Sequence, residues 1–249
     1  DFNISDSNTI FVNSSYDGDE ELGTQSNPFK TISSAYNYFI NDTNSKSNIF
    51  LADGTYTISG RMTITKNLNL IGQSALNTII DVDIKKVLQS DSLPDYEYLF
   101  DILIYGNGIF FITPPLAYIA VSPLVNFVNL TFTRGNSYYG GAVYINQSAV
   151  NFVYTRFKNN SVKDYVHYYA QKTYPASGGA IYNDKGFVRI YNSLFEGICS
   201  FCHSEIIQQY HIHERIYRHL CRCHQDGRCK RCQNPEFQFH KQLCQWNIR

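Results

Sequence analysis

Cysteine is absent from the first 198 residues of this chain, and charged residues are scarce along all of it. Lys and Arg together number 21, Asp and Glu also number 21, and charged residues make up 17% of the 249 residues. A chain of zero formal net charge has no long-range attraction to nucleic acid or to an anionic membrane surface. We therefore expect no nucleic-acid partner.

Long uninterrupted apolar segments are also missing. The most apolar stretch, Ile102–Val128, contains two glycines and three prolines. A membrane-spanning helix needs about 20 consecutive apolar residues without such breaks, so we expect no membrane span. Neither an initiator methionine nor a signal peptide opens the chain, and we expect a mature form or a fragment of a longer protein.

Uncharged polar residues and aromatic residues take the place of charge, with abundant Asn, Ser and Thr, 20 Tyr and 17 Phe. Amides and hydroxyls can bond sugar hydroxyls and aromatic faces can stack on sugar rings, so this composition suits carbohydrate contact. The alternative is that these residues only fill turns and strands. Sequons for N-glycosylation agree with a secreted or cell-surface location, and they begin at Asn3, Asn13, Asn41, Asn129, Asn146 and Asn159.

The first third of the chain predicts one helix and several short strands. Thr31 can cap a helix over Ile32–Ile40, whose apolar residues follow helical spacing. Alternating strands end at Gly, Asn or Asp, and they lie within Ile49–Ile58, Met62–Ile64, Leu68–Gly72 and Thr78–Asp81. Alternation places Ile49 with Leu51 on one face, as a half-buried sheet requires.

Two motifs in this region resemble the start of pectate-lyase-like proteins. Pro28-Phe-Lys-Thr-Ile32 precedes the helix, and Ala52-Asp-Gly-Thr-Tyr56 forms a strand. The chain is most similar to the adhesin-like surface proteins of methanogenic archaea. The resemblance implies an all-β fold, a right-handed single-stranded parallel β-helix with a short N-terminal capping α-helix. It also implies an N-terminal strand and capping helix over residues 1–48 and β-helix coils over residues 49–198.

An internal repeat supports this fold. Gly140-Gly-Ala-Val-Tyr144 recurs as Gly178-Gly-Ala-Ile-Tyr182, 38 residues later. At the same offset Val150 matches Val188 and Phe157 matches Phe195, and a partial earlier copy covers Val125–Phe132. One coil cannot bury its apolar side chains alone, so we expect successive coils to stack them in one interior column. Glycine allows sharp corners at Gly140 and Gly178, and turn amides or Asn ladders are predicted at Asn151, Asn159 and Asn192.

A longer spacing between Phe157 and Gly178 predicts a loop, Val162–Pro175, that projects from one corner. Insertions in solenoids often carry the binding function. The candidate ligand contacts are Tyr165, His167, Tyr168, Tyr169 and Tyr174. The alternative is that these side chains only cover the flank of the coils.

No catalytic set is recognisable, so we assign no catalytic residue. Polysaccharide lyases need Ca²⁺-binding carboxylates beside a basic residue, and hydrolases need paired carboxylates. The outward candidates in the matched coils, Asn151 with Arg189 and Arg156 with Leu194, include no carboxylate. The adjacent acids Asp81 and Asp83 fit a strand end. An acidic stretch over residues 17–21 could bind Ca²⁺, but an exposed loop is the favoured interpretation.

The tail, residues 199–249, differs sharply from the rest because it holds all seven cysteines. Cys199, Cys202, Cys229 and Cys232 form two Cys-x-x-Cys pairs that could bind zinc, and disulfides are an alternative. A third alternative is translation out of frame, because alternation vanishes where the cysteines begin. Read one nucleotide later, codons for Phe237–Ile248 permit an Asn-rich aliphatic sequence like that upstream. We favour this third interpretation.

Together these patterns predict a non-catalytic, adhesin-like β-helix module on the cell surface or outside the cell, with a glycan or cell-surface polymer as partner and no cofactor. Two alternatives remain. One is a polysaccharide lyase or hydrolase, or a degenerate relative of one, because such enzymes use this fold. The other is a purely structural stalk with a zinc-binding tail.

Overall fold

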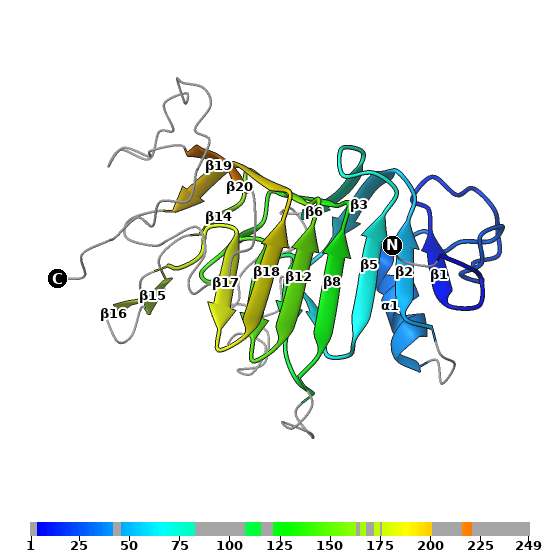
Figure 1. Cartoon of the computed structure of the whole chain (residues 1–249), viewed down its shortest axis with the longest axis horizontal. Coiled ribbons are helices and arrows are strands. Elements are labelled where there is room, and N and C mark those ends of the chain that lie inside the picture. Colours follow the sequence, from blue (N-terminus) through cyan, green and yellow to red (C-terminus); the bar gives the residue numbers. More distant parts are fainter. Residues whose placement is uncertain are drawn as a thin grey trace.

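The computed structural model describes residues 4–41, 46–82, 108–115, 122–162, 165–167, 172–174, 176–200 and 216–220. Strands are the main secondary structure of these residues, and one ten-residue helix lies near the N-terminus (Figure 1). The prediction of an all-β fold is confirmed at this level. No helix in the described ranges is long and apolar enough to cross a membrane.

The described strands form three parallel sheets and one antiparallel hairpin. The six-stranded sheet has the order β1 (Thr9–Val12), β2 (Asn48–Leu51), β5 (Leu68–Gly72), β8 (Leu124–Val128), β12 (Ala149–Val153) and β18 (Phe187–Tyr191). The four-stranded sheet has the order β17 (Ile181–Asp184), β11 (Val143–Asn146), β7 (Phe110–Ile112) and β4 (Met62–Ile64). The hairpin pairs β15 (Tyr165–His167) with β16 (Lys172–Tyr174).

The eight-stranded sheet runs along the remaining side of the core. Its order is β10 (Asn136–Ser137), β14 (Ser161–Val162), β19 (Ser193–Ser200), β13 (Arg156–Lys158), β9 (Thr131–Thr133), β6 (Thr78–Val82) and β3 (Gly54–Ile58). A strand of the tail, β20 (Ile216–Leu220), pairs in parallel with β19.

From β2 to β9, successive strands belong to the six-, eight- and four-stranded sheets in turn, and β11–β12–β13 and β17–β18–β19 again place one strand in each of these sheets. Each such set of three strands is one pass of the chain, and β10 and β14 are further strands of the eight-stranded sheet. The pass β11–β12–β13 is followed by the pass β17–β18–β19, and the two pair in parallel throughout. Val143 pairs with Ile181, Val150 with Val188 and Phe157 with Phe195, which confirms the predicted offset of 38 residues. The 38-residue offset of the sequence repeat is therefore the offset at which these strands pair.

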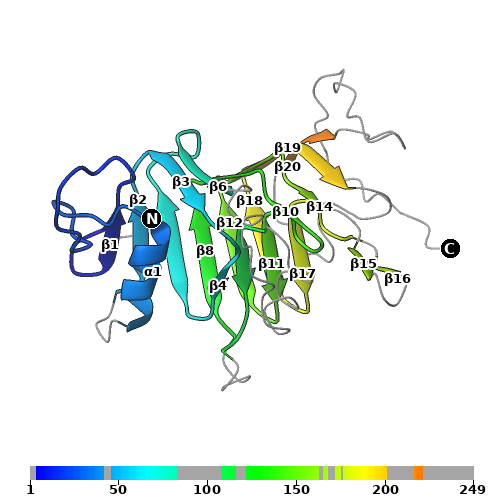
Figure 2. The same ribbon diagram turned by 180° about the vertical axis from the view of Figure 1, so that it is seen from behind.

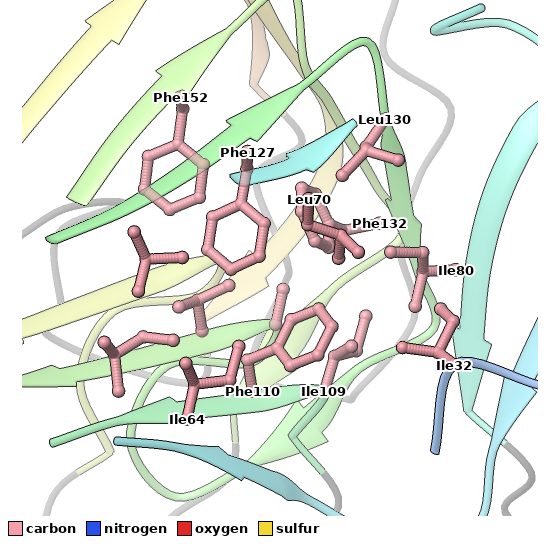
Figure 3. Packing of buried hydrophobic residues seen from close by; sticks show 14 of the residues in the cluster. Ile32, Ile64, Leu70, Ile80, Ile109, Phe110, Phe127, Leu130, Phe132 and Phe152 are labelled. Carbon is pink, nitrogen blue, oxygen red and sulfur yellow. The ribbon is translucent and has the colours of Figure 1, made fainter. Parts of the chain in front are cut away.

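Alternate side chains of each pass point inward and form one continuous core (Figure 3). Val150 and Val188 are 0% and 5% exposed, as predicted. The rings of Phe127 and Phe152 stack with their centroids 5.3 Å apart, and those of Phe157 and Phe195 stack at 4.7 Å. Burial of each such side chain contributes about 1.5–3 kcal/mol to folding, so stacking of passes is the main source of stability.

The predicted helix is present as α1 (Ile32–Asn41). Thr31 caps it, because the Ser34 amide donates to the Thr31 hydroxyl at 3.0 Å. The buried face of α1 joins the main core and packs against β1 and β3, and both views place the helix at the β1–β2 end of the sheets (Figures 1 and 2). The helix therefore covers apolar side chains at this end.

The corners between sheets use left-handed backbone conformations. Gly140 and Gly178 have φ of 62° and 72°, and a Cβ atom at either position would lie within 2.3 Å of a backbone oxygen. This confirms the two predicted glycine corners. Asn159 and Asn192 also occupy corners, with φ of 53° and 47°.

An Asn ladder follows the outer face of the six-stranded sheet. Each amide nitrogen donates to the side-chain oxygen of the preceding rung, at 2.8, 2.7 and 2.6 Å, through Asn48, Asn69, Asn126 and Asn151. The next position in register is Arg189. The prediction that Asn151 belongs to a ladder is confirmed.

Candidate functional site

The outer face of the four-stranded sheet carries an aromatic column beside a polar column. In β11, Val143 and Ile145 are fully buried, so Tyr144 and Asn146 point outward. The same alternation applies to the neighbouring strands β7 and β17. We call the six side chains the aromatic–polar patch, and they are Phe111, Thr113, Tyr144, Asn146, Tyr182 and Asp184. Figure 2 shows β11 and β17 from the side opposite to Figure 1.

The aromatic column crosses three strands without a break. Tyr144 is the register partner of both Phe111 and Tyr182. Its ring centroid lies 5.1 Å from that of Phe111 and 5.1 Å from that of Tyr182. Tyr139 flanks the column, with its ring 5.0 Å from that of Tyr182. These rings are half-buried, and their planes are inclined to one another, by 44° between Phe111 and Tyr144 and by 78° between Tyr144 and Tyr182.

The polar column lies two residues farther along the same strands. Asn146 donates its amide to the Thr113 hydroxyl at 3.1 Å, and its register partner is Asp184. All three side chains are half-buried. The column thus combines a hydroxyl, an amide and a carboxylate, which together offer hydrogen-bond donors and acceptors beside the rings.

The electrostatics of the patch raise the pKa of Tyr182. Burial raises the pKa of Tyr182, and the charge of Asp184 and the neighbouring Tyr139 raise it further. The hydroxyl of Tyr182 is therefore a donor at neutral pH. The Arg61 guanidinium carbon lies 5.9 Å from the Tyr144 ring centroid, which is a cation–π distance.

Arg61 also holds the corner beside the patch. Its Nη2 donates to the carbonyl oxygens of Tyr139 and Gly140, both at 2.8 Å, and to the Ser137 hydroxyl at 3.1 Å. These bonds satisfy carbonyl groups at the left-handed corner of Gly140. Arg61 thereby fixes the position of Tyr139 relative to the column.

The predicted binding loop emerges next to the patch. Its backbone forms the β15–β16 hairpin, in which Tyr165 pairs with Tyr174 and His167 pairs with Lys172. Ser177, just after the hairpin, forms a parallel bridge with Tyr139. Tyr168 and Tyr169 lie outside the described residues. A ligand role for Tyr165, His167, Tyr168, Tyr169 and Tyr174 therefore remains a prediction.

The predicted zinc ligands lie almost entirely outside the described residues. Cys199 is the exception, and its backbone pairs with Ser161 in the eight-stranded sheet. Cys202, Cys229 and Cys232 fall beyond the described ranges, so the zinc hypothesis remains a prediction. Among the residues that the structure describes, no three His, Cys, Asp or Glu side chains gather as a metal site.

Two ion pairs occupy the acidic residues on the eight-stranded sheet. Arg134 donates from both Nε and Nη2 to the Asp81 carboxylate, with the Nε bond at 2.7 Å. Arg156 donates to Glu196 at 2.8 Å. Asp83 lies outside the described residues, so its predicted pairing with Asp81 is not addressed. Arg134 directly follows β9 and Arg156 lies in β13, so each carboxylate has a cationic partner on, or just after, the neighbouring strand.

Sequence reasoning singled out Tyr144 and Tyr182 only as parts of the repeat. The available signal was their alternation with buried Val143 and Ile181, which places both rings outward. Phe111 gave no such signal, because the Gly-Gly-Ala motif is missing before it. Comparison with protein-family models, with curated proteins and with solved structures finds no match for this chain.

Proposed function

We propose that residues 1–198 form a right-handed parallel β-helix that acts as a non-catalytic glycan-binding module. Support for the β-helix comes from the three parallel sheets, from the passes whose strands enter the three sheets in turn, and from the continuous core. Parallel strands joined without crossover helices need such an arrangement to cover their inner faces.

The aromatic–polar patch carries the functional part of the proposal. A pyranose ring has an apolar face of C–H groups and an edge of hydroxyls. The rings of Phe111, Tyr144 and Tyr182 offer stacking partners for the apolar face. The side chains of Asn146 and Asp184, next to them, offer bonds to the hydroxyls. A patch of this kind on a rigid sheet binds without large rearrangement.

A secreted or cell-surface location follows from the same proposal. The surface is built from amides, hydroxyls and aromatic side chains, and only 17% of the residues are charged. The partner would be a glycan or another polymer of a cell surface. In this setting the β-helix is the scaffold, and the patch and the nearby hairpin are the binding elements.

A glycan array with the full chain tests this function. We expect binding that Tyr144→Ala weakens by about tenfold, because loss of one stacked ring removes roughly 1 kcal/mol or more. Tyr154→Ala is the matched control, since Tyr154 is 54% exposed at a corner of a different sheet. Circular dichroism establishes that both variants fold.

Three outcomes contradict the proposal. An array without any bound glycan favours a purely structural stalk. If Tyr144→Ala and Tyr154→Ala lose glycan binding equally, the binding site lies outside the aromatic–polar patch. Release of unsaturated or hydrolysed products from a bound polysaccharide shows that the module is catalytic.

A further inference from the structure

The two columns of the aromatic–polar patch run across the strands, in the direction in which the sheets grow. Each of β11 and β17 contributes one aromatic and one polar side chain, and β7 contributes Phe111, with Thr113 directly after its last residue. Neighbouring strands lie about 4.8 Å apart, and the successive ring centroids, each 5.1 Å apart, keep this spacing. The patch is therefore a repeating surface with one unit per strand.

We propose, building on the glycan-binding function above, that the patch binds a linear β-1,4-linked chain of neutral hexopyranoses with one sugar on each of these three strands. An extended β-1,4-linked chain advances per sugar by nearly the strand spacing, so successive sugars can each contact one ring of Phe111, Tyr144 and Tyr182. The planes of Tyr144 and Tyr182 are inclined by 78°, so these two rings do not both lie flat against the chain. An α-1,4-linked chain of the same sugars curves away from a flat surface. It would lose contact after one or two rings.

The alternation of a β-1,4-linked chain narrows the choice of sugar. Successive sugars in such a chain turn opposite faces to the same surface, so both faces must be apolar enough to stack on a ring. Sugars with all substituents equatorial, such as glucose and N-acetylglucosamine, meet this condition. A sugar with an axial hydroxyl presents a polar group to every second aromatic side chain.

The negative charge of Asp184 disfavours acidic sugars at the β17 end of the patch. The patch itself contains one charged group, the carboxylate of Asp184, at the β17 end. The cation beside it, Arg61, donates to the backbone carbonyls of Tyr139 and Gly140 and to Ser137. A polyuronate would bring its carboxylates beside Asp184, and like charges repel at this range. A neutral chain avoids this cost and can donate hydroxyls to the carboxylate.

Calorimetric titration of the full chain with defined oligosaccharides tests the proposal. We expect affinity for cello-oligosaccharides to rise about three- to tenfold from the disaccharide to the trisaccharide, and to level off at longer lengths. Maltotriose has the same composition as cellotriose with α-1,4 linkages, and β-1,4-linked triglucuronate is the acidic analogue with the linkage unchanged. Both are expected to bind at least tenfold more weakly than cellotriose or chitotriose.

Variants locate the ends of the binding surface. Tyr182→Ala removes the last aromatic side chain, so its affinity is expected to level off at the disaccharide. Tyr144→Ala interrupts the middle and is expected to weaken all lengths. Tyr154→Ala serves again as the control with unchanged affinities.

Failure of this proposal differs from failure of glycan binding itself. Equal affinities for maltotriose and cellotriose, no gain from disaccharide to trisaccharide, or binding of β-1,4-linked triglucuronate tighter than that of cellotriose would overturn it while leaving a glycan-binding module in place. Absence of binding to every glycan on the array overturns the proposed function and this proposal together.

Discussion

Three non-glycine residues hold the same left-handed corner after strands of the six-stranded sheet. Asn129, Tyr154 and Asn192 follow β8, β12 and β18, with φ of 53°, 53° and 47°. Asn tolerates this conformation because its short side chain can bond the local backbone. A tyrosine has no such compensation, so Tyr154 is the strained member of the set.

Replacing Tyr154 with Asn is therefore expected to stabilise the protein. Tyr154 is 54% exposed, so little packing is lost, and relief of the left-handed strain is worth about 1 kcal/mol. Urea unfolding measures the change in free energy. The reverse substitution at the equivalent corner, Asn192→Tyr, should destabilise by a similar amount. A Tyr154→Asn variant no more stable than the parent would contradict the strain argument.

A buried hydroxyl makes stability sensitive to alkaline pH. The hydroxyl of Tyr56 donates to the carbonyl oxygens of Ala52 at 2.7 Å and Val12 at 3.1 Å. Burial is the main cause that raises the pKa of Tyr56 to about 12. The folded state holds this proton more tightly than the unfolded state does. The stabilisation that the Tyr56 hydroxyl gives to the folded state is therefore complete below pH 10 and is lost as the pH rises toward 12.

Tyr56→Phe tests this contribution. At neutral pH the variant is expected to be about 1–3 kcal/mol less stable, because the two carbonyl groups lose their donor. The gap between the parent and the variant should narrow between pH 10 and 12, as followed by denaturant unfolding at several pH values. A gap that stays constant over this range would be inconsistent with the raised pKa. The parent and the variant contain the same other tyrosines, so the effect of those residues on the free energy of unfolding cancels in the difference between the two proteins.

At the scale of elements, the Asn ladder ties four strands together on their outer side. Asn126 takes part in two of its bonds, as donor to Asn69 and as acceptor from Asn151. Asn126→Ala breaks both and is expected to cost about 1–3 kcal/mol. Thermal unfolding measures the loss, with Asn37→Ala on the exposed side of α1 as control. Equal stabilities of the two variants would show that the ladder contributes nothing.

Elements with a repeated spacing were predictable from the sequence. The pairing of β12 with β18 and of β13 with β19 follows from one offset, because identical pass lengths keep identical side chains in register. The helix was predictable from its apolar period and from Thr31. The pairing of β7 with both β4 and β11 was not, because the sequence between β6 and β7 contains no copy of the repeat that would fix the register.

The aromatic–polar patch and the ion pairs could likewise be predicted only in part from the sequence. Tyr144 and Tyr182 could be placed outward from alternation alone, but their proximity to Phe111 depended on the unseen register of β7. Arg134 and Asp81 are 53 residues apart and occupy different positions of neighbouring strands. No sequence period connects them, so their pairing emerges only when the strands are stacked.

At the scale of the whole molecule, the two ends of the sheets differ. The helix α1 covers the β1–β2 end, whereas β17 and β18 are the last described strands of their sheets at the other end (Figure 1). A strand of the tail, β20, pairs with β19. Among the described residues, β17 and β18 are the end strands of their sheets, a position at which further parallel strands could pair.

Sequencing of the gene tests whether the tail, read in another frame, encodes further strands that could follow β17 and β18. We expect the frame shifted by one nucleotide after residue 198 to stay open and to encode alternating aliphatic residues. An early stop codon in that frame would exclude the frame shift. Zinc analysis of the purified chain is the complementary measurement, because one bound zinc per chain would support the ligand set of Cys199, Cys202, Cys229 and Cys232.

The Asn ladder has a direction that concerns the molecule as a whole. Each amide donates toward the N-terminal end, so the side-chain dipoles align head to tail across four strands, and their negative pole lies at Asn151. The residue in register beyond this pole is the cation Arg189. The arrangement parallels a positive charge at the C-terminus of a helix. An acidic residue at position 189 would oppose the aligned amides of the entire row.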